Sequence, residues 1–547
     1  MNDPEQPTNP QQTSVSTEVP ATPTSPPEPP KTESTEAKKP SKKSHLWLYI
    51  IIVVIVIIAA LGTWYGVHKS NNQSSTTKKD IPLITYGFDN NPLNVFYPSA
   101  AEFGGPMVMN EQIFEGLVSF TNGTQIVPDL ATSWTNPNTD TWIFTLRPNT
   151  YYHDGDVVTA QDVVYSWQQL NAQDQNLASY TTSTIKNVQA TNNNTVEITT
   201  TAPDPVLLNR LTNLYIIDSK APKGTQPWEL GTGAYTVKSG TTPTANAIDL
   251  VAFNKWHGGH IYTRAINYIF YANSSDAVSA LISGKVNLVD SVQPADMTKI
   301  KKYSNLTVTE TPPVETTYLA FNTLTANSPL ANPKIREAID LTLNPADILK
   351  AEGPDSGTAI DQVLPPQIPG YNQSIVRPAI NLTEAKQLVL AAYPNGVTIN
   401  LGNSPTGEVA GQEIVNELAP IGITVKQDVA NSEGEYFGDI ANGTYQTFFE
   451  TYGSSISDGS DVLSYWQNAP FYDNPTFDAE VTKADQTFDP AQRLADLQQA
   501  SQTLISDNAI IPLYQNSYYT ASKKGFVFPI GTYDSDLDTF FSTAYQQ

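Results

Sequence analysis

One apolar run near the start of the chain stands apart from the mixed pattern that follows it. From Leu46 to Val67, 22 consecutive residues carry no charge. A helix of that length, at about 1.5 Å per residue, spans the roughly 30 Å hydrocarbon core of a membrane. The run follows 45 largely polar residues, unlike a cleaved signal peptide, which starts near the N-terminus. The pattern therefore predicts a transmembrane helix over 46–67. Aromatic residues suited to the membrane interfaces flank it at both ends: Trp47, Tyr49, Trp64 and Tyr65.

The flanks of this run predict its orientation. Five lysines precede it and three follow closely, which places the N-terminus in the cytoplasm and the large remainder outside the cell. Residues 1–45 hold ten prolines and no Phe, Trp or Tyr, so they bury too little apolar surface to fold. We expect a disordered cytoplasmic tail over 1–45, then the single-pass helix, then a flexible linker over 68–79.

Beyond residue 80 the hydrophobic pattern switches repeatedly between a period of two and a helical period. Alternating stretches are typical of half-buried strands, and apolar positions three and four apart are typical of helices. This succession predicts an α/β architecture. The predicted strands cover 141–147, 194–201, 397–403 and 423–429, and the predicted helices cover 159–170, 333–343 and 410–422.

Composition excludes several classes of function. The chain has no cysteine, which rules out disulfides, thiolate metal sites, a cysteine nucleophile and a lipidated N-terminal cysteine as anchor. Eight of the 30 basic and six of the 54 acidic residues precede residue 80, so the rest carries 22 basic and 48 acidic residues, a formal charge of −26. Phosphate binding needs the opposite sign, so nucleic acid is not an expected partner.

No short motif indicates catalysis or a cofactor. The stretch "GNSPTGEV" (402–409) has phosphate-loop glycine spacing but lacks the Lys that grips phosphate. In "HGGH" (257–260) two histidines suggest a metal site, yet no third ligand is evident, and a glycine loop is the better interpretation. In "HDGD" (153–156) the polar residues are interpreted as a structural turn. We therefore expect no catalytic residue, no metal and no cofactor, which favours binding over chemistry.

Seven segments, taken together, resemble the extracellular solute-binding proteins of peptide-type ABC importers, the oligopeptide/dipeptide-binding family. They occur in that family's order and approximate spacing and extend over the chain after residue 80. The segments are "PDLATSW" (128–134), "WIFTLRPNTYYHDGDVVTAQDVVYSW" (142–167), "GTGAYTV" (231–237), "ALISGKVNLVD" (280–290), "YLAFNT" (318–323), "NPKIREAIDLTLN" (332–344) and "IIPLYQNSYY" (510–519). Within them, Gly155, Gly231 and Gly233 are expected to permit tight turns.

The resemblance implies a two-lobed periplasmic-binding-protein-like fold that closes on ligand between its lobes. Lobe one would combine 80–120, 231–313 and 511–547, with an extra domain at 121–230. Lobe two would be 314–510. The chain would cross between the lobes near 311–317 and 509–515.

The same resemblance implies a set of ligand-contacting residues. In the peptide binders an extended peptide forms main-chain hydrogen bonds with both lobes. The family's main cleft strand in lobe two falls on 450–455, with Tyr452 facing the ligand, and ordinary packing is the alternative for each tyrosine in the set. The implied residues are Glu102, Phe103, Gly104, Tyr180, Tyr318, Glu450, Tyr452, Gly453, Ser455 and Tyr514.

One position departs from the family pattern. The aspartate that pairs with a peptide's ammonium in the family falls on Ser455, whereas Asp458 and Asp461 follow three and six residues later. Either Asp458 substitutes through a loop shift, or the ligand lacks a free amino terminus.

The expected function is that of a membrane-anchored, monomeric, extracellular substrate-binding protein that delivers oligopeptides or similar solutes to an ABC permease and its ATPase subunits. The alternatives are a receptor or scaffold of the same fold that is not coupled to transport, and a hydrolase. The sequence leaves the identity and length of the ligand open.

Overall fold

The computed structural model describes most of the chain from Lys78 to the C-terminus. The predicted tail 1–45, the predicted helix 46–67 and nearly all of the linker 68–79 lie outside the described residues. In the part that is described, no helix is both long and apolar enough to cross a membrane. The described stretches are 78–88, 105–121, 124–244, 246–290, 292–311, 315–325, 327–353, 355–405, 407–528 and 541–547.

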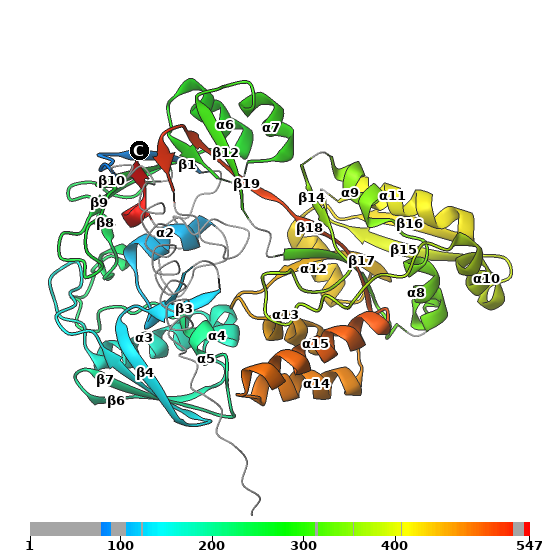
Figure 1. The fold of residues 1–547 in the computed structure, drawn as a ribbon, viewed down its shortest axis with the longest axis horizontal. Coiled ribbons are helices and arrows are strands. Elements are labelled where there is room, and N and C mark those ends of the chain that lie inside the picture. Colours follow the sequence, from blue (N-terminus) through cyan, green and yellow to red (C-terminus); the bar gives the residue numbers. More distant parts are fainter. Residues whose placement is uncertain are drawn as a thin grey trace, which may run out of the picture. The chain divides into compact units, whose positions relative to one another are not determined.

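A seven-stranded sheet gathers segments from both ends of the described chain, in the order β12-β19-β11-β1-β10-β9-β8 (Figure 1). Strand β1 lies in its middle, parallel to both β10 and β11. The core on one face includes helix α2, and the core on the other includes α6 and α7. Bounds are β1 Ile84–Phe88, β8 Tyr235–Val237, β9 Ala247–Ala252, β10 Ala265–Phe270, β11 Leu288–Val289, β12 Leu306–Thr311, β19 Tyr518–Lys523, α2 Gly105–Ile113, α6 Ser274–Ser283 and α7 Pro294–Ile300.

A four-stranded antiparallel sheet, β4-β5-β7-β6, packs against α3, α4 and α5. The strands predicted at 141–147 and 194–201 are confirmed as β5 and β7, and the helix predicted at 159–170 is confirmed as α3. A capping box starts that helix, because the Thr159 main-chain N–H donates to Asp162 Oδ2 at 2.7 Å. Bounds are β4 Ala131–Asn138, β5 Thr141–Leu146, β6 Ile185–Asn192, β7 Thr195–Thr200, α3 Ala160–Gln173, α4 Gln175–Thr181 and α5 Leu207–Leu211.

A six-stranded mixed sheet, β14-β18-β13-β17-β15-β16, has helices on both faces. In β13, Tyr318 and Ala320 enter the core with α12–α15, while Leu319 and Phe321 enter the core with α8–α11. This double burial explains why "YLAF" is apolar at every position. The strands predicted at 397–403 and 423–429 are confirmed as β15 and β16.

The remaining bounds of this sheet and its helices are β13 Glu315–Phe321, β14 Gly357–Ala359, β15 Val397–Asn403, β16 Ile423–Val429, β17 Thr447–Gly453, β18 Ile510–Asn516, α8 Pro333–Asp340, α9 Pro345–Glu352, α10 Leu382–Ala392, α11 Glu408–Leu418, α12 Glu433–Ala441, α13 Gly459–Gln467, α14 Pro475–Gln486 and α15 Pro490–Ser506. Smaller elements are the hairpin β2 Val118–Thr121 with β3 Gln125–Pro128, the pair β20 Phe526–Val527 with β21 Tyr545–Gln546, and 3-10 turns at Pro227–Glu229, Pro329–Ala331, Ala419–Ile421 and Phe541–Thr543.

The implied domain layout needs one correction, because it placed residues from 511 onward in lobe one. Strand β18 instead pairs with β13 and β14 inside the six-stranded sheet. Its first six residues are all buried, because this sheet is covered by helices on both faces. The chain returns to the seven-stranded sheet after Asn516, where β19 begins at Tyr518.

The predicted role of Gly231 and Gly233, which precede β8, is also corrected. Gly155 has φ 103° and makes the expected turn, but Gly231 and Gly233 are not among the residues with positive φ. They are needed for close approach to the end of α2. A Cβ on Gly231 would lie 2.0 Å from the Ile113 carbonyl oxygen, and Gly233 N–H donates to that same oxygen at 2.8 Å.

We therefore expect Gly231→Ala to lower the free energy of unfolding by about 2 kcal/mol or more, because the new methyl group forces main chain apart. Gly434→Ala in α12 is the matched control, since its Cβ would meet nothing within 4 Å. In a helix this control should raise stability by about 0.5–1 kcal/mol. Urea unfolding followed by circular dichroism measures both, and equal stability of the two variants would contradict the close-approach explanation.

Candidate functional site

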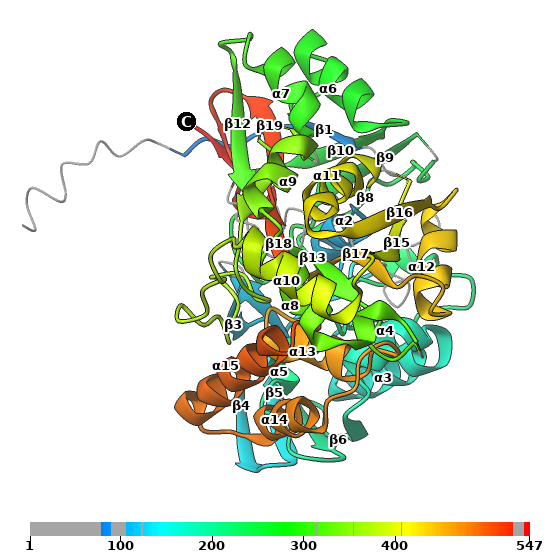
Figure 2. The same cartoon turned by 90° about the vertical axis from the view of Figure 1, so that its right-hand side faces the viewer.

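A cavity of about 530 Å³ lies between the four-stranded-sheet domain and the six-stranded-sheet domain. Figures 1 and 2 show α4, α5 and α13 side by side around this place. We call it the tyrosine cavity. One wall consists of Asn176, Ser179, Tyr180, Ser183 and Arg210, and the other of Tyr452, Ser455, Asp461, Ser464, Tyr465, Asn468, Ala469 and Pro470.

Direct contacts join the two walls at the edge of this cavity. Asn209 Nδ2 donates to the Ile456 carbonyl oxygen at 2.9 Å, and Asn213 Nδ2 donates to the Ser455 carbonyl oxygen at 3.0 Å. Farther along, the rings of Trp142 and Phe488 lie 6.3 Å apart. The structure therefore shows the two domains in contact, with polar bonds that a small separation would break.

Tyrosine rings form the apolar part of the cavity. Tyr452 at the end of β17 and Tyr465 in α13 stack with centroids 4.5 Å apart. Tyr180, from α4, stands on the opposite wall. Burial raises the pKa of both Tyr452 and Tyr465, so their hydroxyls stay protonated at neutral pH. Such rings offer flat apolar faces with a polar group at the end, which suits ligands of varied shape.

Charges of opposite sign stand on the two walls. Arg210 lies on one wall, where its Nη1 donates to the Tyr180 carbonyl oxygen at 2.8 Å and its Nε lies 3.3 Å from Asp204 Oδ2. On the other wall, Asp461 Oδ2 accepts from the Ser455 main-chain N–H at 2.6 Å. Burial raises the pKa of Asp461, although this hydrogen bond and the Arg210 charge act to lower it. The cavity lining therefore includes one basic and one acidic side chain, of which Arg210 is already paired with Asp204.

Three predicted ligand residues, Tyr180, Tyr452 and Ser455, line this cavity. Glu450 is 6% exposed, and burial raises its pKa to about 7 despite a hydrogen bond with Tyr465. Glu450 lies two residues before Tyr452, on the same face of β17. Gly453 ends the strand, paired with Glu315 of β13.

Two predicted tyrosines do not line the cavity. Tyr318 is fully buried, donates its hydroxyl to the Val363 carbonyl oxygen at 2.8 Å and meets the Trp466 ring edge-on at 5.8 Å. Tyr514 is 7% exposed in the core on the other face of the same sheet. Their positions favour the packing alternative. Glu102, Phe103 and Gly104 lie outside the described residues.

The structure favours a structural role for Asp458 over the suggested role as a ligand's ammonium partner. Its two carboxylate oxygens accept from Arg493 Nη1 at 2.8 Å and Nη2 at 2.7 Å, and Oδ1 also caps α13 through the Ser460 N–H. Asp458 is therefore the acidic partner in a structural ion pair with Arg493. Asp461, by contrast, is an acidic residue that lines the tyrosine cavity.

Sequence reasoning missed Arg210, Tyr465 and the choice of Asp461 over Asp458. No local signal marks Arg210, because its importance depends on a domain 240 or so residues later in the chain. The helical spacing of α13 offered one usable signal. Asp461 and Tyr465 are four residues apart and therefore share a helix face.

Comparison with known proteins decides the family. The model described as bacterial extracellular solute-binding proteins, family 5 Middle, matches residues 125–474. The chain belongs to this family. The resemblance that the seven segments suggested is thereby confirmed, and the protein is a solute-binding protein of the ABC-importer type rather than an enzyme.

Several relatives, though not all of them, are named for peptide binding, and the matches also include the "Heme-binding protein A" of Haemophilus influenzae. The solute-binding protein is 25% identical over 480 residues to the "Probable D,D-dipeptide-binding periplasmic protein DdpA" of Escherichia coli (strain K12), which covers 82% of this chain and 89% of that one. It is 26% identical over 468 residues to the "Periplasmic oligopeptide-binding protein OppA" of the same organism, with 76% and 83% covered. The periplasmic binding protein DppA from Helicobacter pylori, solved with the peptide STSA, superposes with a TM-score of 0.70 at 22% identity, covering 86% and 98%. The two-lobed α/β fold is confirmed.

The buried Asp458–Arg493 pair generates a prediction about stability. Asp458→Asn should lower the free energy of unfolding by about 3 kcal/mol, because the guanidinium loses its bidentate partner inside the protein. Asparagine keeps the helix cap, so the loss reports the ion pair alone. Glu337→Gln, which breaks the exposed Lys334–Glu337 pair, should cost less than about 1 kcal/mol. Equal urea midpoints for the two variants would contradict the structural role.

Proposed function

We propose that this solute-binding protein captures peptides in the tyrosine cavity and delivers them to the permease of an ABC importer. The observation that carries the proposal is the composition of the two cavity walls. The two walls come from different domains and carry charged side chains of opposite sign. Each wall also contributes at least one tyrosine ring. The names of DdpA and OppA supply the ligand class.

The wall chemistry suits a short peptide with free ends. Asp461 would accept hydrogen bonds from the ammonium, in the role that the family pattern gives to an aspartate at the position of Ser455. Hydroxyl and amide side chains on both walls can bond the main-chain groups of the peptide, a mode that tolerates varied side chains. Tyr452 and Tyr465 would take those side chains without strict selection. A ligand without an amino group remains the alternative.

Closure of the two domains would follow from the same geometry. A ligand shifts an open-to-closed equilibrium only if it binds one state better, and a ligand touching both walls does so. The bonds from Asn209 and Asn213 to the opposite domain would exist only in the closed state. They would add to ligand contacts without depending on ligand identity.

A peptide series tests the cavity. Peptides of two to five residues, each with a free and an N-acetylated amino terminus, are titrated calorimetrically into the full-length protein. Free peptides should bind the wild type better than acetylated ones, and Asp461→Asn should weaken free peptides by about tenfold or more, as expected for the loss of a charged partner. The acetylated series should bind both proteins alike.

The matched control for this series is Asp428→Asn, an exposed aspartate on β16 far from the cavity lining, which should leave both series unchanged. Equal binding of free and acetylated peptides to the wild type would remove the ammonium site. Failure of every peptide to bind would remove the peptide proposal and favour a receptor for another solute.

We further propose that the apolar run from Leu46 to Val67 anchors the protein in the membrane, with its N-terminus in the cytoplasm. The run has sufficient length, and a cysteine-free chain cannot carry the lipid on cysteine that would serve instead. An anchor of this kind would keep the binding domains beside their permease.

The full-length protein should therefore sediment with membranes after a carbonate wash, and protease added outside should remove the large domain. Replacing Val54 and Ile58 by lysine should release the protein, since each charge at the centre of a span costs about 2.5–3.5 kcal/mol in insertion. Lysines at Ser74 and Thr76 in the linker are the control and should change nothing. A soluble wild-type species beginning near residue 70 would contradict the anchor.

A further inference from the structure

A second cluster of polar side chains lies apart from the tyrosine cavity, in the domain of the seven-stranded sheet. Glu115, Asp129 and His257 each place a ligand atom within 4.8 Å of the others. Glu115 follows α2, Asp129 follows β3, and His257 lies in the "HGGH" loop after β9. The sequence showed no third ligand for this loop, because the two carboxylates come from segments more than 120 residues earlier.

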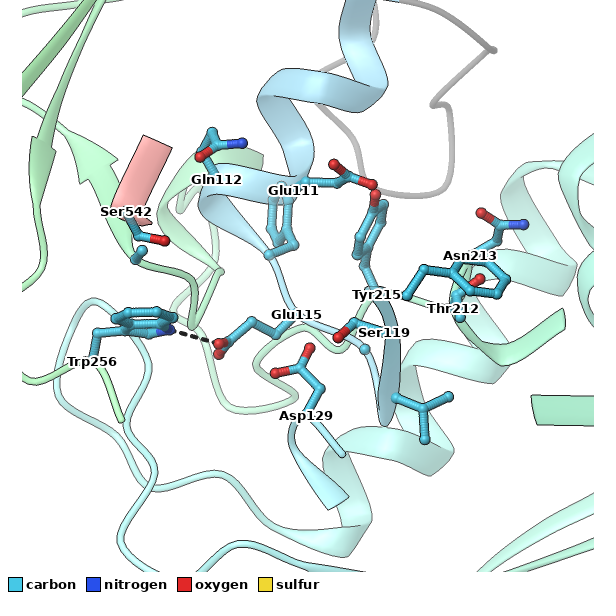
Figure 3. A pocket seen from close by; sticks show the side chains of 15 residues that line it. Glu111, Gln112, Glu115, Ser119, Asp129, Thr212, Asn213, Tyr215, Trp256 and Ser542 are labelled. Atoms are coloured by element: carbon cyan, nitrogen blue, oxygen red, sulfur yellow. Dashed lines mark hydrogen bonds between the residues drawn. The ribbon is translucent and has the colours of Figure 1, made fainter. Parts of the chain in front are cut away.

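Among the described residues, one buried carboxylate oxygen of the cluster has no hydrogen-bond partner. His257 Nε2 lies 2.9 Å from Glu115 Oε1 and 3.7 Å from Asp129 Oδ1. Trp256 Nε1 donates to Glu115 Oε1 at 2.7 Å and holds that carboxylate in place (Figure 3). The Glu115 side chain is 8% exposed, and within the described residues its Oε2 has no hydrogen-bond partner. A buried carboxylate oxygen without a partner is costly unless something absent from the structure satisfies it.

Among the described residues, neither carboxylate of the cluster forms an ion pair with a lysine or an arginine. Arg147 is the nearby cation, but its Nε and Nη2 donate to the Asp129 main-chain carbonyl oxygen rather than to the carboxylate. Two facing carboxylates in a partly desolvated place therefore favour either a proton or a bound cation.

There is room for a cation beside the two carboxylates, in a cavity that His257 does not itself line. A cavity of about 140 Å³ is lined by Glu115 and Asp129 together with Ser119, Thr212 and Trp256, among others. Figure 3 shows the Glu115 carboxylate directed toward Trp256, with the Asp129 carboxylate beside it. The space is enough for an ion with one or two waters to complete its coordination.

We propose that Glu115, Asp129 and His257 form a binding site for a divalent transition-metal cation, with Zn²⁺ as the best fit. One imidazole nitrogen with two carboxylate oxygens is a donor set for Zn²⁺ and its first-row neighbours, whereas Mg²⁺ and Ca²⁺ prefer oxygen ligands alone. Three protein ligands leave a position open for water. A metal here joins α2, the end of β3 and the 257–260 loop.

A second acidic cluster provides the competing site that the test must separate. Asp154, Asp156 and Asp218 also come within 4.8 Å of one another, but they include no histidine and two of them are exposed. Asp154 Oδ1 already accepts from the Asp156 N–H, and Asp218 Oδ1 accepts from the Lys220 N–H. An all-oxygen group of this kind suits Ca²⁺ better than Zn²⁺.

The experiment titrates Zn²⁺ into full-length protein that has been stripped with a chelator, using calorimetry and thermal unfolding. One ion should bind per chain and raise the melting temperature, because binding to the folded state alone stabilises it. His257→Gln and Asp129→Asn should each weaken Zn²⁺ at least tenfold. Co²⁺ should give visible absorption bands in the wild type that His257→Gln removes.

Controls come from the same loop and from the competing cluster. His260→Gln changes an exposed histidine that pairs with Asp80, and Asp156→Asn changes the second cluster; both should leave Zn²⁺ affinity unchanged. Asp129→Asn also distinguishes a metal-binding role of Asp129 from a purely structural one. Without metal it should be at least as stable as the wild type, because it removes a charge facing Glu115.

Three results would overturn the site. They are the absence of Zn²⁺ binding to the wild type, an equal loss of affinity in His260→Gln, and a loss of affinity in Asp156→Asn. A drop in metal-free stability of Asp129→Asn with unchanged Zn²⁺ affinity would likewise assign the cluster a structural role only.

Discussion

Two strands that cross together between the sheets are the constraint on which the rest of this protein depends. β12 pairs with β19 in the seven-stranded sheet, and the next strands of the same two segments, β13 and β18, pair in the six-stranded sheet. The ladders are antiparallel on both sides, with Thr311 opposite Tyr518 and Thr317 opposite Tyr514. Near the junction, the Tyr518 hydroxyl donates to Glu315 and the Ser517 hydroxyl to Glu310. The same two segments therefore pair with each other in both sheets, on either side of the junction (Figure 1).

A connection of this kind limits relative motion mainly to bending at the junction, and such hinges are typical of ligand-binding domains that close. The walls of the tyrosine cavity lie on the two domains that such bending would bring together. Among the described residues, the hydrogen bonds between the walls include two from asparagine amides, which are neutral and cost little to break. The arrangement is consistent with a receptor that must close on its ligand and then open again to release it.

Three sites show how differently buried carboxylates are accommodated in this acidic chain. Asp458 is neutralised by Arg493, with which it forms a bidentate ion pair. Glu450 lies behind the cavity, where burial raises its pKa to about 7, so a proton occupies it readily. Glu115 and Asp129 face each other with neither an arginine nor a lysine on their carboxylates among the described residues, and the proposed metal ion supplies the missing charge. The three solutions differ because the local supply of cations differs.

The sequence alone determined the secondary structure where burial and periodicity agree, as in β5, β7, α3, β15 and β16. It also determined the family, since that rested on the order of seven segments along the chain. It could not assign β18, because an apolar strand reveals that it is covered but not by which sheet. Only the tertiary structure decided which aspartate lines the cavity, which tyrosines face it, and that His257 meets Glu115 and Asp129. Those outcomes depend on side chains from distant segments meeting in space, and no local pattern of hydrophobicity or charge encodes such meetings.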